Sequence, residues 1–166
     1  MQTLGALRPL RALTAGTIAA AALAQQWQPL MPSERSDHSA AYDLGRARML
    51  VFGGGSNYEA ASGTWAWDGL RWSQVNSAQT PSLRSQAAMT FDWARGRSVL
   101  FGGASGFALL NDTWEHDGTN WTQRSPSNSP SSRIGSRMVF DVFRNRAILF
   151  GGQSLLTGFT DETWEY

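Results

Sequence analysis

The tripeptide Phe-Gly-Gly occurs three times in this chain, and its constant spacing restricts the possible folds more than any other feature. The copies lie at 52–54, 101–103 and 150–152, so that each is 49 residues from the next. An apolar run precedes each copy. A fixed period of this length predicts a structural unit repeated along the chain. We therefore divide the chain into repeats before considering any single residue.

Many other positions keep the same phase. They are Arg35, Arg84 and Arg133; Pro32, Pro81 and Pro130; Asp43, Asp92 and Asp141; Arg46, Arg95 and Arg144; Trp65, Trp114 and Trp164; and Trp72 with Trp121. The repeats cover about 35–83, 84–132 and 133–166. A period near 50 with paired glycines is typical of β-propeller arrays. We predict an all-β chain of three four-stranded antiparallel blades.

Each repeat is predicted to contain four short strands. The first follows the arginine, as in 134–140, and the second is the apolar run before the glycines, at 49–52, 99–101 and 147–150. The third surrounds a tryptophan at 64–67, 113–116 and 163–166, and the fourth carries Trp72 or Trp121. Unbroken apolar runs suit strands buried on both faces. Asp-Gly pairs at 68–69 and 117–118 indicate tight turns between the third and fourth strands.

The repeated glycines and tryptophans are predicted to serve the scaffold. Glycine permits positive φ or a close backbone approach, and this role is expected for Gly53, Gly54, Gly102, Gly103, Gly151 and Gly152. Tryptophan buries a large apolar area. Packing between blades, rather than a platform for sugars, is therefore expected for Trp65, Trp72, Trp114, Trp121 and Trp164. In the segment Asp-x-x-Arg-x-Arg, the aspartate is expected to cap a turn and to pair with arginine.

The N-terminus resembles a secretory signal peptide over residues 1–24. Arg8 and Arg11 precede a short apolar run, and Ala-Leu-Ala at 22–24 fits a cleavage site. The run is too short to span a bilayer, which needs about 20 residues. We expect a propeller segment of residues 25–166 that is secreted or periplasmic, with no membrane contact after cleavage.

Composition argues against several classes of function. Residues 25–166 contain 12 arginines and 13 acidic residues, a balance that does not favour nucleic-acid binding. The chain has no cysteine and two histidines, His38 and His116. Metal sites built on thiolate or imidazole ligands are therefore hard to assemble, and we expect no metal and no cofactor.

A binding site is expected where the loops differ between repeats. The loops at 55–63, 104–112 and 153–162 share little sequence and should lie on one side of the blades. Candidate ligand-binding residues on that side are Arg35, His38, Arg84, Gln86, Arg133 and Arg137. Such a pocket would suit an anionic or hydroxyl-rich ligand. Alternatively, the in-phase arginines bind backbone carbonyls between blades.

No catalytic constellation is evident. Asp112, Asp161 and Glu162 lie in the variable loops, where a carboxylate pair could serve glycoside hydrolysis. The simpler interpretation, which we favour, is that these are solvated loop residues. A binding function is accordingly favoured over an enzymatic one.

The arginine-led first strand, the apolar strand ending in Gly-Gly and the downstream tryptophans resemble the kelch-repeat family over 27–166, in particular secreted bacterial kelch proteins. The resemblance implies antiparallel blades with the first strand innermost. It also implies a protein or glycan partner. Galactose oxidase has kelch repeats, but no residue of its copper site can be matched here. An alternative is therefore the non-catalytic propeller of an extracellular carbohydrate-active enzyme, related to galactose oxidase or to a glycosidase.

Three blades are fewer than the four to eight of closed propellers. Trp-Gln-Pro-Leu at 27–30 resembles a displaced fourth strand, whereas residues 164–166 resemble a third strand with no fourth after it. Two interpretations remain open. Either the chain is part of a longer propeller, or two chains join head to tail as a homodimer with a six-bladed ring.

Overall fold

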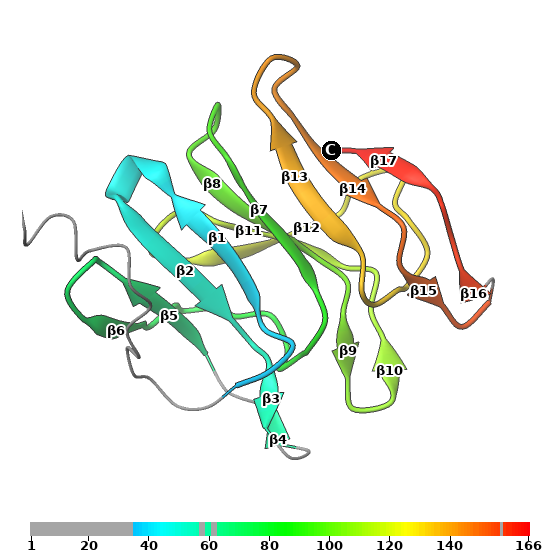
Figure 1. Ribbon diagram of the computed structural model, residues 1–166, viewed down its shortest axis with the longest axis horizontal. Coiled ribbons are helices and arrows are strands. Elements are labelled where there is room, and N and C mark those ends of the chain that lie inside the picture. Colours follow the sequence, from blue (N-terminus) through cyan, green and yellow to red (C-terminus); the bar gives the residue numbers. More distant parts are fainter. Residues whose placement is uncertain (1–34, 57–58, 61–62, 157) are drawn as a thin grey trace, which may run out of the picture. The chain divides into compact units, whose positions relative to one another are not determined.

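The computed structural model describes residues 35–56, 59–60, 63–156 and 158–166, which lie in one compact unit, Pro32–Tyr166. This unit contains three antiparallel sheets, shown in Figure 1, and each sheet corresponds to one predicted repeat. The predicted signal peptide at 1–24 and the predicted strand at 27–30 lie outside the described residues. No helix in the described part is long and apolar enough to cross a membrane.

The sheets are three successive blades of the same topology. The first blade has the order β1-β2-β5-β6, from β1 (Ser39–Asp43), β2 (Arg48–Phe52), β5 (Thr64–Trp67) and β6 (Trp72–Val75). The second has the order β7-β8-β11-β12, from β7 (Ala88–Asp92), β8 (Arg97–Phe101), β11 (Thr113–His116) and β12 (Trp121–Arg124). The third has the order β13-β14-β17, from β13 (Arg137–Asp141), β14 (Arg146–Phe150) and β17 (Thr163–Glu165). The all-β fold of repeated antiparallel blades is confirmed.

The predicted start of the first strand is wrong. Strand β13 begins at Arg137 rather than at Ile134, and the in-phase arginines lie four residues before β1, β7 and β13. The intervening residues run past the neighbouring loop, where Ser36, Ser85 and Ile134 form isolated bridges with Gly55, Ala104 and Gln153. The arginines therefore belong to a lead-in segment and not to the blade sheet.

Each variable loop contains a small hairpin that sequence periodicity did not predict. The hairpins are β3 (Gly55–Ser56) with β4 (Glu59–Ala60), β9 (Ala104–Ser105) with β10 (Ala108–Leu109), and β15 (Gln153–Ser154) with β16 (Gly158–Phe159). Figure 1 shows that they extend away from the turns β1–β2, β7–β8 and β13–β14. We call the side that carries them the hairpin face.

The turns between first and second strands follow the predicted chemistry. The Asp43 carboxylate accepts a hydrogen bond from the backbone N–H of Arg46 at 3.1 Å, and it caps the short 3-10 turn η2 (Leu44–Arg46). The guanidinium of Arg46 lies 3.1 Å from the same carboxylate. Asp92 and Asp141 make the equivalent backbone contacts to Arg95 and Arg144. The aspartate therefore shapes this turn in all three blades.

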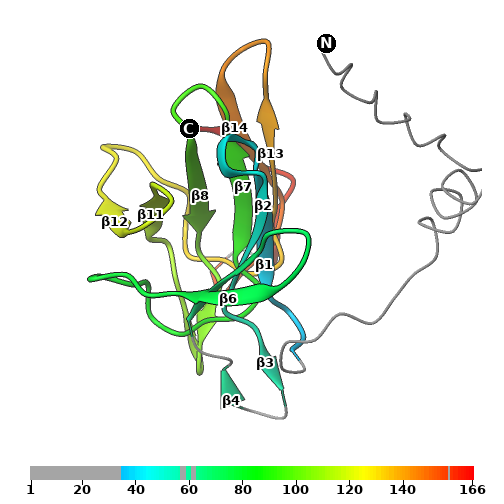
Figure 2. The same ribbon diagram turned by 90° about the vertical axis from the view of Figure 1, so that its left-hand side faces the viewer.

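The first strands lie side by side on the inner side of the blades. Strand β7 contacts both β1 and β13, and Figure 2 shows these strands on one side of the unit and β12 on the other. One buried cluster joins the first two blades and contains Leu50, Phe52, Met89, Leu100 and Trp121. A second joins the last two and contains Ala88, Phe101 and Leu149. The apolar core therefore lies between blades, where burial of apolar surface is the main stabilising term.

The predicted roles of the glycine pairs are confirmed by the backbone. All six glycines have positive φ. The second glycine of each of the first two pairs also donates its N–H across to the next blade: Gly54 binds the carbonyl of Arg84, and Gly103 binds that of Arg133, both at 2.9 Å. The Phe-Gly-Gly string therefore marks the place where one blade is fixed to the following one.

Candidate functional site

Arg84 is buried and its guanidinium is fully engaged within the protein. Nη1 donates to the backbone carbonyl of Gly102 at 3.0 Å, and both terminal nitrogens bind the Asp112 carboxylate, at 2.5 and 2.8 Å. Nε and Nη2 donate to the carbonyl and hydroxyl of Ser82. This geometry supports the structural role proposed as the alternative for the in-phase arginines.

Arg133 repeats this arrangement one blade later. Its Nη1 binds the carbonyl of Gly151 at 3.2 Å, and its Nη2 lies 2.6 Å from the Glu162 carboxylate. Arg35 is only half-buried, donates to the carbonyl of Gly53 at 3.4 Å and lies over the ring of Trp65. In each case the acceptor carbonyl lies in the same blade. The bond between blades comes instead from the carbonyls of Arg84 and Arg133.

The loop carboxylates are not free solvated groups, contrary to our expectation for Asp112 and Glu162. Burial tends to raise the pKa of Asp112, but hydrogen bonds from Arg84 and Trp114 outweigh it and hold the pKa below its ordinary value. Hydrogen bonds from Arg133 and Trp164 likewise lower the pKa of Glu162. Because each carboxylate already neutralises a blade arginine, neither is an available acid or base. Asp161 is exposed.

The lead-in segments are joined by a backbone ladder that crosses the blades. The N–H of Gln86 donates to the carbonyl of Asp37 at 2.8 Å, and the N–H of Gly135 donates to the carbonyl of Gln86 at 3.1 Å. These residues are in phase, and all three have positive φ. The ladder places equivalent residues of successive blades in a row beside the inner strands.

Two of the predicted binding residues meet in a hollow on the hairpin face. Gln86 and Arg137 are exposed and line this hollow together with Gln153, Phe159 and Thr160. His38 is also exposed but does not line it. The predicted group of six therefore divides into two sets. Arg84 and Arg133 are buried and fix the scaffold, whereas Gln86 and Arg137 can reach a ligand.

The hairpin face also carries exposed apolar side chains that sequence analysis did not single out. Phe107 at the turn of β9–β10 is fully exposed, and Leu155, Leu156 and Phe159 on β15–β16 are each at least 78% exposed. They do not follow the 49-residue period, and this lack of phase was the available signal. Large apolar side chains grouped on a surface are typical of protein contact sites.

The opposite side of the second blade holds a buried charged network instead of a site. Glu115 is buried and binds Arg95 at 2.6 Å and Arg124 at 2.8 Å, and it accepts a hydrogen bond from the Tyr166 hydroxyl at 2.9 Å. Burial tends to raise the pKa of Glu115, but the bonds from Tyr166 and Arg124 hold it below its ordinary value. The network connects the second and third blades.

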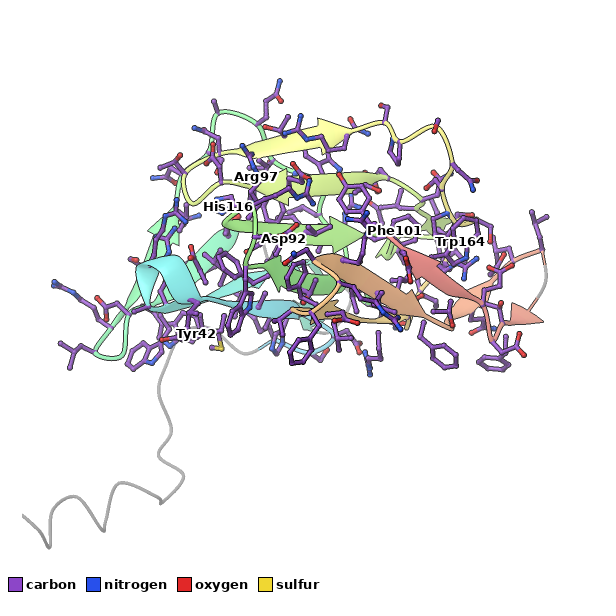
Figure 3. The ribbon with its side chains drawn as sticks, turned by 90° about the horizontal axis from the view of Figure 1, so that it is seen from above. Tyr42, Asp92, Arg97, Phe101, His116 and Trp164 are labelled. Atoms are coloured by element: carbon purple, nitrogen blue, oxygen red, sulfur yellow. The ribbon has the colours of Figure 1, made fainter. Side chains whose placement is uncertain are left out.

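His116 is the buried histidine of the described part. Its Nδ1 accepts the N–H of Gly118 at 3.2 Å, and its ring lies 4.9 Å from that of Trp121. Burial, with a smaller contribution from Arg48, lowers the pKa of His116 to about 4. Figure 3 shows His116 among the strands near Arg97 and Asp92, with Phe101 next to Trp164 farther along the blades. Across the described residues, no three His, Cys, Asp or Glu gather as metal ligands.

Repeated four-stranded blades, inner first strands and carbonyl-to-glycine bonds between blades define a partial β-propeller. Comparison with known proteins agrees with this class. The model of the KLHDC2/KLHL20/DRC7 Kelch-repeats domain matches residues 20–166, and the chain belongs to the kelch-repeat family. Kelch domains of this kind are protein-interaction modules. A search of curated proteins gave no match.

Proposed function

We propose that this chain is a secreted interaction module that binds a protein ligand through its hairpin face. The observation that carries the proposal is the group of exposed apolar side chains at Phe107, Leu155, Leu156 and Phe159. Aromatic side chains at the centre of an interface contribute most of its binding energy. Gln86 and Arg137 supply polar contacts at the edge of the same face.

The chemistry of the face favours protein over glycan. Trp114, Trp121 and Trp164 pack against the two inter-blade clusters, so their rings do not form an open platform. Apolar residues at the hairpins match an amphipathic peptide or the apolar patch of a protein. An acidic group on that ligand would pair with Arg137, since guanidinium and carboxylate form a charge-assisted hydrogen bond.

Binding screens test the proposal directly. A phage-displayed peptide library and a glycan array are presented to the purified chain. Peptides should be selected, and Phe107→Ser or Phe159→Ser should weaken their binding at least about tenfold, which corresponds to roughly 1.4 kcal/mol.

Phe143→Ser is the matched control, because Phe143 is 95% exposed but lies on the β13–β14 turn, away from the hairpins. Selection of glycans alone would replace the protein ligand by a carbohydrate. Peptide binding that is equally weakened by the control, or by neither hairpin variant, would contradict the assignment of the face. Intact mass of the exported chain tests secretion, with an N-terminus at Gln25 as the expected result.

A further inference from the structure

The first two blades show how a fourth-strand tryptophan joins neighbouring blades. Trp121 on β12 is buried against the first blade, and its Nε1–H donates to the hydroxyl of Thr64 at 2.8 Å. Its ring lies 5.3 Å from that of Phe52. Phe52 and Thr64 therefore form a receptor for the tryptophan of the following blade. The 49-residue period places the same pair of residue types in the other two blades.

The receptor of the second blade is open. Its members, Phe101 and Thr113, line a hollow together with Pro126, Leu149 and Trp164. Among the described residues, the third blade has three strands, and no fourth strand pairs with β17 to bring a tryptophan here. An unpaired strand edge beside an apolar hollow is suited to strand addition.

The receptor of the third blade faces solvent. Its members, Phe150 and Thr163, are both exposed, as is Val139 on the same face of the sheet. The equivalent residues of the first blade, Phe52 and Ala41, are buried against the second blade. The third blade therefore exposes a surface that its predecessors cover.

The first blade carries the complementary group. Trp72 corresponds to Trp121, and its indole nitrogen is buried without a hydrogen-bond partner among the described residues. Its ring contacts only Trp67 among the aromatic neighbours described. A buried unpaired N–H is unfavourable and needs an acceptor. The acceptor equivalent to Thr64 is a threonine of a preceding blade.

We propose that a second copy of this chain supplies that blade, and that two copies associate head to tail through two equivalent interfaces. The second copy's Trp72 packs on Phe150 and donates to the hydroxyl of Thr163. Residues 27–30 of the second copy add to β17, and their tryptophan fills the hollow at Phe101 and Thr113. Every receptor then receives one tryptophan. Two copies give six blades, within the four to eight of closed propellers.

Two further contacts repeat in the same direction. Arg46 and Arg48 bind the carbonyls of Asp117 and Gly118 in the next blade, both at 2.5 Å. Arg144 and Arg146, which follow in phase, are exposed and have no such turn before them among the described residues. The second copy's Asp68-Gly69 turn provides those carbonyls. The backbone ladder also continues, from the carbonyl of Gly135 to the second copy's Asp37.

Native mass tests the association. Sedimentation velocity of the purified chain is compared with its intact mass, which also corrects for any processing at the N-terminus. The expected species has twice the mass of the chain, with no larger assemblies, because a twofold arrangement closes on itself. A monomer, or a series of increasing assemblies, would overturn the proposal.

Matched substitutions test the residues. Phe150→Asp should raise the dimer dissociation constant at least tenfold, whereas Phe143→Asp, at an exposed turn position, should leave it unchanged. Trp72→Phe and Thr163→Val should each weaken the dimer to a similar extent. Trp121→Phe removes the same N–H inside one chain and should leave the dissociation constant unchanged. Circular dichroism confirms that each variant is folded, and a dimer indifferent to Phe150→Asp and Trp72→Phe would overturn the assigned interface.

Discussion

At the residue scale, the in-phase arginines are structural anchors. Arg84 joins the loop carboxylate Asp112 to the glycine carbonyl at the end of β8, and Arg133 does the same with Glu162. The arginine and glycine positions were evident from the period. The acidic partners were not, because they lie 28 and 29 residues farther along the chain and differ in type. A sequence pattern finds repeated residues but not the partners they select in space.

Arg84→Met should be strongly destabilising. It leaves the Asp112 carboxylate and the Gly102 carbonyl without their donor, and breaking a buried ion pair costs about 3 kcal/mol or more. Arg71→Met is the control, because Arg71 is 84% exposed and 3.8 Å from Asp68, so it should cost less than about 1 kcal/mol. Urea unfolding measures both. Equal losses would show that Arg84 is not an anchor.

His116 should make stability depend on pH. Its pKa is about 4 in the folded state, below the ordinary 6.5 of the unfolded chain. The unfolded state therefore takes up the proton first as pH falls. The stabilisation is complete above pH 6.5 and declines between pH 6.5 and about 4, by up to roughly 3 kcal/mol. Unfolding at pH 7 and pH 5 should show a loss that is much smaller in His116→Phe; an identical loss in both proteins would contradict this assignment.

At the element scale, the junction after each second strand fixes the distance between blades. At Gly102, φ is +66°, and an added Cβ would lie 2.8 Å from the carbonyl oxygen of Arg133 in the next lead-in segment. The second strands were predicted to within two residues because a buried strand needs an unbroken apolar run. The small hairpins were missed because two-residue strands contain no measurable alternation.

Gly102→Ala and Gly96→Ala separate backbone strain from this close approach. Gly96 has φ of +63° with nothing near its added Cβ, so alanine should cost only the left-handed strain of about 1–2 kcal/mol. Gly102→Ala adds a clash between blades and should lower the free energy of unfolding by clearly more. Thermal and urea unfolding of both variants provide the comparison. Similar values for the two would mean that the blades can separate slightly without penalty.

At the scale of the whole molecule, repeated and unrepeated residues have different duties. Residues that keep the 49-residue phase, such as Arg84, Gly103 and Trp121, form contacts within and between blades. Residues that break the phase, such as Phe107 and Phe159, are exposed on the hairpin face. The blade fold could therefore be derived from the period. The candidate site could be located only by its side, because its shape depends on hairpins that differ in each repeat.

Amide hydrogen exchange with a selected peptide tests this division of duties most directly. Exchange is followed by mass spectrometry in the free and bound chain. We predict that the peptide protects amides at 104–109 and 153–159, with no change at the turns 43–48, 92–97 and 141–146. Protection confined to those turns, or spread evenly over the blades, would contradict a binding surface on the hairpin face.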